Sequence, residues 1–178
     1  ISVKDFEGDR YILMGTQKGI VKKTHISAFS RPRRNGIIAL SIRDEDKLIE
    51  AKLSDGDNNV LFITEAGKSI NFHEKDVREM GRTATGVRAI KLQKDDNVIA
   101  MVVARDEYKI LTISEHGFGK RTLIKEFRVQ NRGGSGIIAM KNTEKTGKLV
   151  TALRISENEE IMIITENGVV IRQNTENI

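Results

Sequence analysis

The sequence predicts an all-β fold assembled from repeated, propeller-like units of about four strands each. The first observation is a period. Gly residues that follow short apolar runs recur at spacings of 48, 50 and 51 residues, at Gly19, Gly67, Gly117 and Gly168. The second is that apolar residues alternate with a period of two over strand-length runs, and no segment has helical periodicity over three turns. A period near fifty residues is typical of blades, because a four-stranded sheet buries both faces only against its neighbours.

Composition places the chain among globular domains. Its 178 residues are 38% hydrophobic and 31% charged, which argues against disorder. No apolar run reaches the length of a membrane span, and the absence of Cys excludes disulfides and thiolate metal sites. We therefore expect a cytoplasmic location. The chain opens at Ile1, and residues 1–10 look like the tail of a preceding repeat, so we expect a piece of a longer protein.

Each unit is predicted to begin with a β-hairpin. A short apolar or alternating run is followed by a turn that contains Gly, with the sequences TQKG, TEAG, SEHG and TENG, which is the pattern of two strands joined by a tight turn. The outgoing strands are predicted at residues 11–14, 60–64, 109–113 and 160–165. The return strands are predicted at residues 20–24, 68–72, 118–122 and 169–173.

Two further strands complete each whole unit. A basic connector, with helical turns predicted at residues 26–30 and 75–80, leads to strands at residues 37–42, 87–92 and 137–141. Acidic turns lead to last strands at residues 48–53, 98–103 and 149–153. One repeat domain thus spans residues 1–178, with units at about 11–58, 59–108 and 109–159 and a partial unit at 160–178. Three and a half blades do not close a ring, which predicts either an open arc or a longer protein.

Basic charge is concentrated in the same part of every unit. Residues 18–36, 67–86 and 117–136 together carry 15 Lys or Arg and 4 Asp or Glu, a net charge of +11. The rest of the chain carries 15 basic and 21 acidic residues, a net charge of −6. Because stacked units superimpose equivalent segments, these windows should merge into one positive stripe that suits an anionic partner.

The candidate binding residues are the basic side chains of these windows. Arg and Lys contacts to phosphate position a nucleic acid without reading its sequence. Phe29, Val77 and Phe127 share one phase of the repeat and are predicted to lie in the core, which argues against stacking on single strands and favours duplex DNA. The candidates are the strand residues Lys22, Lys23, Lys120 and Arg121 and the loop residues Arg31, Arg33, Arg34, Arg78, Arg82, Arg128 and Arg132.

No catalytic, metal or cofactor site is predicted. His25, His73 and His116 lack the spacing of metal ligands, and no carboxylate pair stands out from the acidic turns. Residues 132–136, RGGSG, are rich in Gly but lack the Lys and Ser or Thr of a phosphate-binding loop. We interpret them as a flexible turn.

Five stretches, GIVKKT, GFGKRT, NGIIALSI, TGVRAIKL and SGIIAMKN, resemble the C-terminal domain of the bacterial gyrase A subunit, whose blades carry G-x-x-K-R-T and then G-V-x-x-I. The resemblance implies a six-bladed β-pinwheel, in which neighbouring blades exchange strands and duplex DNA wraps around the basic perimeter. It also implies a heterotetramer with the rest of gyrase A and gyrase B, acting at the nucleoid. Residues 130–136, QNRGGSG, approximate the family's box Q-R-R-G-G-K-G, with Asn131 and Ser135 at basic positions, and we interpret them as the related loop of a later blade.

Two alternatives remain open at the level of sequence. One is the matching domain of topoisomerase IV, a sister family whose ring is less basic and lacks the box. The other is a propeller-like scaffold in which the basic stripe binds acidic proteins. Duplex binding with a steep salt dependence and no sequence preference would favour a DNA-binding domain over the scaffold.

Overall fold

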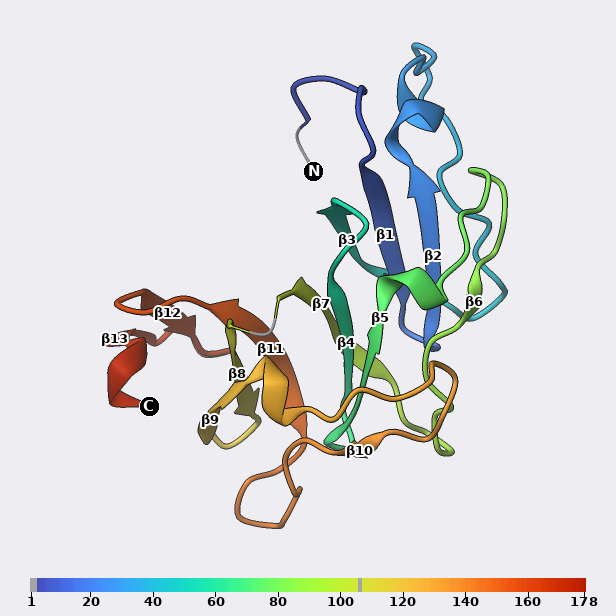
Figure 1. Cartoon of the computed structure of the whole chain (residues 1–178). Helices are drawn as coiled ribbons and strands as arrows, with labels where there is room; N and C mark the ends of the chain where they lie inside the picture. The colour runs from blue at the N-terminus through green and yellow to red at the C-terminus, as the bar shows by residue number, and fades with distance from the viewer. Residues whose placement is uncertain (1–2, 106) are drawn as a thin grey trace.

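The computed structural model describes residues 3–105 and 107–178 and confirms an all-β fold. Figure 1 shows its sheets following one another along a curved path from the N-terminal to the C-terminal end of the chain. The predicted hairpins are present, with their ends within two residues of the predicted limits. Among the described residues, no helix is long and apolar enough to cross a membrane.

The first sheet combines strands from two units. It contains β1 (Tyr11–Thr16), β2 (Ile20–His25), β3 (Leu48–Ser54) and β6 (Val87–Arg88), in the order β3-β1-β2-β6. The sheet is antiparallel, and β6 comes from the second unit to pair with β2 of the first. Neighbouring units therefore exchange a strand.

The second sheet repeats this arrangement. It contains β4 (Asn59–Thr64), β5 (Lys68–His73), β7 (Val98–Ala104) and β10 (Ile137–Ile138), in the order β10-β5-β4-β7. Its outermost strand β10 is supplied by the third unit. Two exchanges at equivalent places confirm the pinwheel connectivity that the family resemblance implied.

The last two sheets have fewer strands. The third has the order β11-β8-β9, from β8 (Lys109–Ser114), β9 (Gly119–Leu123) and β11 (Leu149–Ile155). The fourth is the hairpin of β12 (Glu160–Ile164) and β13 (Val170–Asn174). In the first two sheets, the outermost strand belongs to the connector of the following unit, so β9 is the strand to which such a connector would pair.

Short 3-10 turns follow every hairpin. They are η1 (Ile26–Phe29), η2 (Glu74–Asp76), η3 (Ile124–Glu126) and η4 (Thr175–Asn177). The two predicted helical turns are thus present, although η2 is shorter than predicted. The residues that cap the start of η1, η2 and η4 are His25, His73 and Asn174. The side chain of each accepts a hydrogen bond from the backbone N–H two positions later in the chain.

The predictions for the connector strands are partly wrong. Residues 37–42 form no strand, because the equivalent segments pair with the hairpin of the unit before their own, and the hairpin that the structure describes within residues 3–36 belongs to the same unit as residues 37–42. The strands predicted at 87–92 and 137–141 are shorter in the structure, where they are β6 and β10. After each of these strands, the backbone bends toward the glycine in the hairpin turn of the preceding unit. The Ala89 and Ala139 N–H groups donate to the carbonyl oxygens of Gly19 and Gly67.

Two hydrophobic clusters lie between the sheets. One contains Phe62, Phe72 and Val77, and the other contains Ile110 and Phe127. The predicted core positions of Val77 and Phe127 are confirmed, since their side chains are 0% and 4% exposed. Phe29 is only half-buried. These clusters join consecutive units into one continuous body.

The inner and outer sides of the arc follow from the sheet order. Strands β3, β7 and β11 contact one another across successive sheets and form the inner side. Strands β6 and β10 occupy the opposite edge of their sheets and form the outer side. The basic connectors reach these outer strands from the 3-10 turns, so they lie along the outer rim.

Candidate nucleic-acid interface

The connector of the first unit forms an exposed tip. The Arg33 carbonyl oxygen accepts a hydrogen bond from the Gly36 N–H at 2.8 Å, which closes a turn with a positive φ at the glycine. Arg31, Arg33 and Arg34 are all exposed. Within the described part of the chain, their side chains have no hydrogen-bond or ion-pair partner, so three guanidinium groups are available to an anion.

Arg78 and Arg128 occupy equivalent positions in the next two units. Each directly follows a buried anchor, Val77 or Phe127, and backbone alternation turns the Arg outward as the anchor turns inward. Both arginines are exposed. No side-chain partner of either is found among residues 3–105 and 107–178, which makes them matched candidates on successive units.

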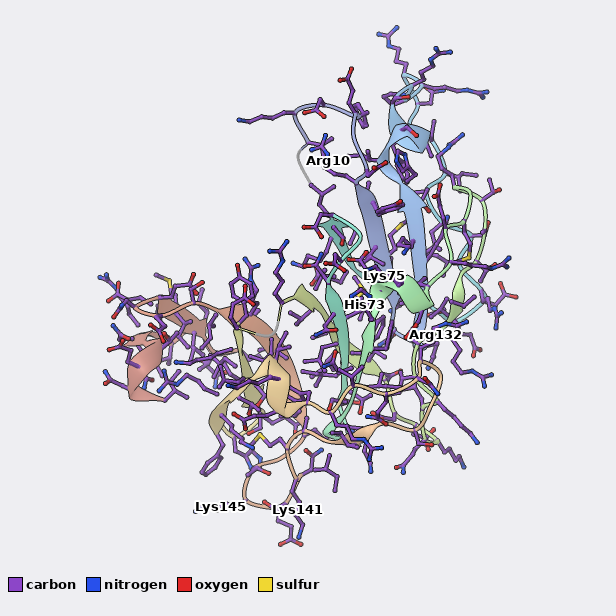
Figure 2. All side chains as sticks on the ribbon, viewed as in Figure 1. Arg10, His73, Lys75, Arg132, Lys141 and Lys145 are labelled. Carbon is purple, nitrogen blue, oxygen red and sulfur yellow. The ribbon has the colours of Figure 1, made fainter. Side chains whose placement is uncertain are left out.

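Arg82 and Arg132 are held against the preceding unit. The Arg132 guanidinium donates from Nε to the Asp76 carbonyl oxygen at 2.9 Å and from Nη1 to that of Arg88 at 3.1 Å. Arg82 donates from Nη1 to the Ile38 carbonyl oxygen at 3.2 Å. Figure 2 shows Arg132 beside the η2 turn. Both side chains are half-buried, so much of their hydrogen-bonding capacity is directed into the protein.

The strand pair Lys22 and Lys23 does not reach the surface, which corrects the prediction that these residues face DNA. Lys22 is 0% exposed and its Nζ donates to the carbonyl oxygens of Ala39, at 2.7 Å, and Arg82. Burial, and next the charge of Arg82, lower the pKa of Lys22 to about 8. Lys23 is 8% exposed, and its Nζ donates to the Glu74 carbonyl oxygen at 2.9 Å. Both lysines stabilise a contact between units.

In the second strand pair, Lys120 faces solvent and Arg121 makes contacts within the protein. Lys120 is exposed on β9. Arg121 is half-buried and donates from Nε to the Ile178 carbonyl oxygen and from Nη2 to that of Glu176, both at 3.0 Å. Lys23 and Arg121 thus occupy equivalent positions, and both bind backbone carbonyls at the 3-10 turn of the following unit, η2 and η4 respectively. Structural contacts between units therefore explain part of the basic repeat.

Sequence reasoning missed basic residues that lie beyond the chosen windows. Arg88, on β6, and Lys91 and Lys141, which follow β6 and β10, are exposed at the outer edge. Lys91 and Lys141 are fifty positions apart, a recurrence that could have identified them. Figure 2 shows Lys141 and Lys145 on the loop that projects beyond β10. Lys145 has an internal contact, since its Nζ lies 5.3 Å from the Phe118 ring centroid.

We give the name rim cations to ten exposed basic side chains along the outer side of the first three units; the exposed Lys75 is not one of them, because its Nζ is paired with Asp57 Oδ1 at 2.7 Å. In the part of the chain that the structure describes, none of them has an internal hydrogen bond or ion pair. They come from three successive units and can bind phosphates spaced along a polyanion. The rim cations are Arg31, Arg33, Arg34, Arg78, Arg88, Lys91, Lys120, Lys125, Arg128 and Lys141.

The loop of residues 130–136, of which residues 132–136 were predicted as a flexible turn, is fixed by backbone hydrogen bonds. The Gln130 N–H donates to the Asn71 carbonyl oxygen at 2.8 Å, and the Lys91 N–H donates to that of Gly134 at 2.8 Å. Gly136 has a positive φ of 70°, and an added Cβ would lie 2.3 Å from the Ser69 carbonyl oxygen. Only glycine permits this approach, so the sequence SGIIAM anchors one unit on another.

The strand-exchanged sheets and the basic outer edge define a β-pinwheel array with a surface suited to a long polyanion. The family model described as "DNA gyrase C-terminal domain, beta-propeller" matches residues 10–55, 58–105, 108–156 and 159–178. The chain belongs to this family.

Individual relatives agree with the family match. The chain is 56% identical over 178 residues to the DNA gyrase A protein of Halalkalibacterium halodurans, covering 100% of the chain and 21% of the relative. A solved structure of the DNA gyrase A C-terminal domain superimposes with a TM-score of 0.86 at 26% identity, covering 99% of this chain and 59% of that one. The C-terminal domain of DNA topoisomerase IV gives 0.93 at 22% identity, covering 100% and 56%. The chain spans about a fifth of the length of the curated relatives it matches.

Proposed function

We propose that this chain binds duplex DNA along its outer rim and bends it, as the DNA-wrapping part of a gyrase A protein. The observation that carries the proposal is the set of rim cations, which recur on successive units of a family named for DNA gyrase. Contacts to phosphates give affinity that is independent of sequence. Because the exposed cations follow the outer edge, the path of the DNA follows the curve of the array.

Bending requires contacts from several units. Smoothly bending 20 to 30 base pairs by 40 to 90° costs on the order of 1 to 6 kcal/mol. Each phosphate contact contributes only a part of this, so contacts must be distributed over the first three units. The rim cations supply such a distribution, with Arg33, Arg78 and Arg128 as representatives of the three units.

The chemistry of the parent enzyme lies elsewhere in this proposal. The rim cations are suited to ionic contacts with phosphate, and DNA cleavage and ATP hydrolysis are assigned to other domains or proteins of a type II topoisomerase. The proposed partners are the remainder of gyrase A and the gyrase B protein, in a heterotetramer. No cofactor is proposed for this chain.

The matching domain of topoisomerase IV is the second candidate, favoured by the TM-score of 0.93 to that domain. Two observations favour gyrase A instead. The identity to the gyrase A domain structure is higher, at 26% against 22%, and the relative that matches all 178 residues at 56% identity is a DNA gyrase A protein. A supercoiling assay with this segment grafted into each parent enzyme separates the two candidates, because support of negative supercoiling is what the resemblance to gyrase A implies.

The salt dependence of duplex binding tests the proposal. If about five to eight phosphates are contacted, the logarithm of affinity should fall with the logarithm of salt concentration at a slope of roughly −5 to −7. Two duplexes of unrelated sequence should give the same slope. A slope near −1, or binding that is confined to an acidic protein, would refute DNA binding at the rim and favour the scaffold alternative.

A further inference from the structure

The basic residues of the connectors have two different environments. Arg128 is exposed with no internal partner among the described residues, whereas Arg132, four positions later, is half-buried and bonded to two carbonyl oxygens. Both residues carry the same charge in the same loop. Because their contacts differ, Arg128 can offer a phosphate more guanidinium N–H groups than Arg132 can.

Arg132 joins three segments of the array. Its own loop belongs to the third unit, the Asp76 carbonyl oxygen belongs to η2 of the second unit, and the Arg88 carbonyl oxygen belongs to β6, the outer strand of the first sheet. The guanidinium is planar and presents its N–H groups in a fixed fork, so two bonds of 2.9 and 3.1 Å fix its orientation. A tilt of one unit on the next would break at least one of them.

The second of these contacts, from Nη1 to a backbone carbonyl oxygen, recurs one unit earlier. Arg82 lies fifty positions before Arg132, and its acceptor Ile38 lies fifty positions before Arg88. The Arg82 carbonyl oxygen is in turn bound by Lys22, which also holds the carbonyl oxygen of Ala39. A contact that repeats with the period of the array acts at each junction in the same direction, so its effects on curvature add along the arc.

We propose that Arg132, with Arg82 as its counterpart, is a positioning residue that fixes the angle between consecutive units and thereby the bend imposed on DNA, without itself contacting phosphate. This inference rests on the proposed DNA-bending function. It divides the basic residues of the repeat into two groups. The rim cations determine the affinity for DNA, and Arg82 and Arg132, which we call the junction arginines, determine the curvature of the array. Loss of a rim cation and loss of a junction arginine then have different consequences.

The test compares Arg132→Gln with the matched control Arg128→Gln. Each change removes one positive charge from the same loop. Since the chain contains no Cys, the replacements Ser27→Cys and Glu144→Cys introduce two exposed labelling sites, one on the first unit and one on the third. The distance distribution between spin labels reports the angle between units in the protein without DNA. Salt titrations on a duplex of about 12 base pairs, too short to need bending, report phosphate contacts.

For Arg132→Gln we expect a broadened label distribution, an unchanged salt slope on the short duplex, and weaker end-to-end energy transfer on a long labelled duplex. For Arg128→Gln we expect an unchanged label distribution and a salt slope reduced in magnitude by about 1. Arg132→Lys, which retains the charge but lacks the fork, should broaden the label distribution while keeping the wild-type slope.

The opposite pattern would overturn the inference: if Arg132→Gln reduces the slope like the control and leaves the label distances unchanged, Arg132 is a phosphate contact. Thermal unfolding identifies a variant that fails to fold, and Arg82→Gln, which removes the bond to the Ile38 carbonyl oxygen, then replaces it. If the wild-type chain fails to bind duplex DNA, the proposed function is wrong. The label distances in the protein without DNA still decide whether Arg132 fixes the junction.

Discussion

The side-chain amide of Asn71 donates a hydrogen bond to the carbonyl oxygen of Phe127 at 2.8 Å, inside the contact between the second and third units. Asn71 is 1% exposed and Phe127 is 4% exposed. Lys23 and Arg121 occupy equivalent positions in the first and third units and likewise bind backbone carbonyls of the following unit. The position that Lys23, Asn71 and Arg121 share thus joins successive units. Its side chain is charged in two units and neutral in one, so the common feature is an N–H donor and not a charge.

Asn71→Ala should lower the free energy of unfolding by about 1 to 3 kcal/mol, because it leaves a buried carbonyl oxygen without a partner. The control is Asn131→Ala, at an exposed position, which should change stability by no more than about 0.5 kcal/mol. Urea titration of both variants measures the difference. Equal stabilities would show that the Asn71 bond contributes nothing to the junction.

Gly136→Ala should disrupt the pairing of β10 with β5. The new Cβ would lie 2.3 Å from the Ser69 carbonyl oxygen, whereas a Cβ at Gly36 meets nothing within 4 Å. Both glycines have a positive φ, of 70° and 78°, so Gly36→Ala isolates the backbone strain of about 1 to 2 kcal/mol. We expect Gly136→Ala to be clearly the more destabilising of the two in thermal unfolding. A smaller loss at Gly136 would contradict the close approach of the two units.

Phe127→Ala should cost about 3 to 5 kcal/mol of stability, because the ring is buried among side chains of two units. DNA binding should then be lost only through unfolding. Calorimetry on the variant, with binding measured well below its transition temperature, separates the two effects. A variant with wild-type stability but weakened DNA binding would instead indicate that the Phe127 ring stacks on bases.

Lys22 should make stability depend on pH in the alkaline range. Its pKa falls from 10.5 in the unfolded chain to about 8 in the folded protein, so between these values the folded state binds fewer protons than the unfolded state. The contribution of Lys22 to the free energy of unfolding therefore increases as pH rises from about 8 toward 10.5. In Lys22→Ile, which introduces the residue found at the equivalent position Ile70, this part of the pH dependence should disappear. Parallel pH profiles for the two proteins would contradict the assignment.

The hairpins were predictable because their signals are local. A strand, a turn with glycine and a return strand lie within about fifteen residues, and the positive φ of Gly19 and Gly67 confirms the turns. The failure at residues 37–42 has a different origin, since that segment becomes a strand only when another unit supplies its partner. Pairing between units is a tertiary property that alternation of side chains cannot show.

The binding residues were predictable only in part for the same reason. Lys22 and Arg33 look alike in sequence, but the carbonyl acceptors of Lys22 lie 17 and 60 positions away. Periodicity identifies a shared environment without saying whether that environment faces solvent or the next unit. The recurrence of Lys91 and Lys141 shows that the period also extends beyond the glycine-bounded windows.

Energy transfer between the ends of a labelled duplex of about 30 base pairs measures the central claim, that DNA is bent around the outer rim. We expect transfer to rise when the wild-type chain binds. Charge reversal at Arg33 with Arg34, at Arg78, or at Arg128 should each weaken binding to every duplex sequence, and the combined variant should also lose the bend. If each single-unit variant bends DNA normally and only one of them changes affinity, the contact is local and the DNA does not follow the rim.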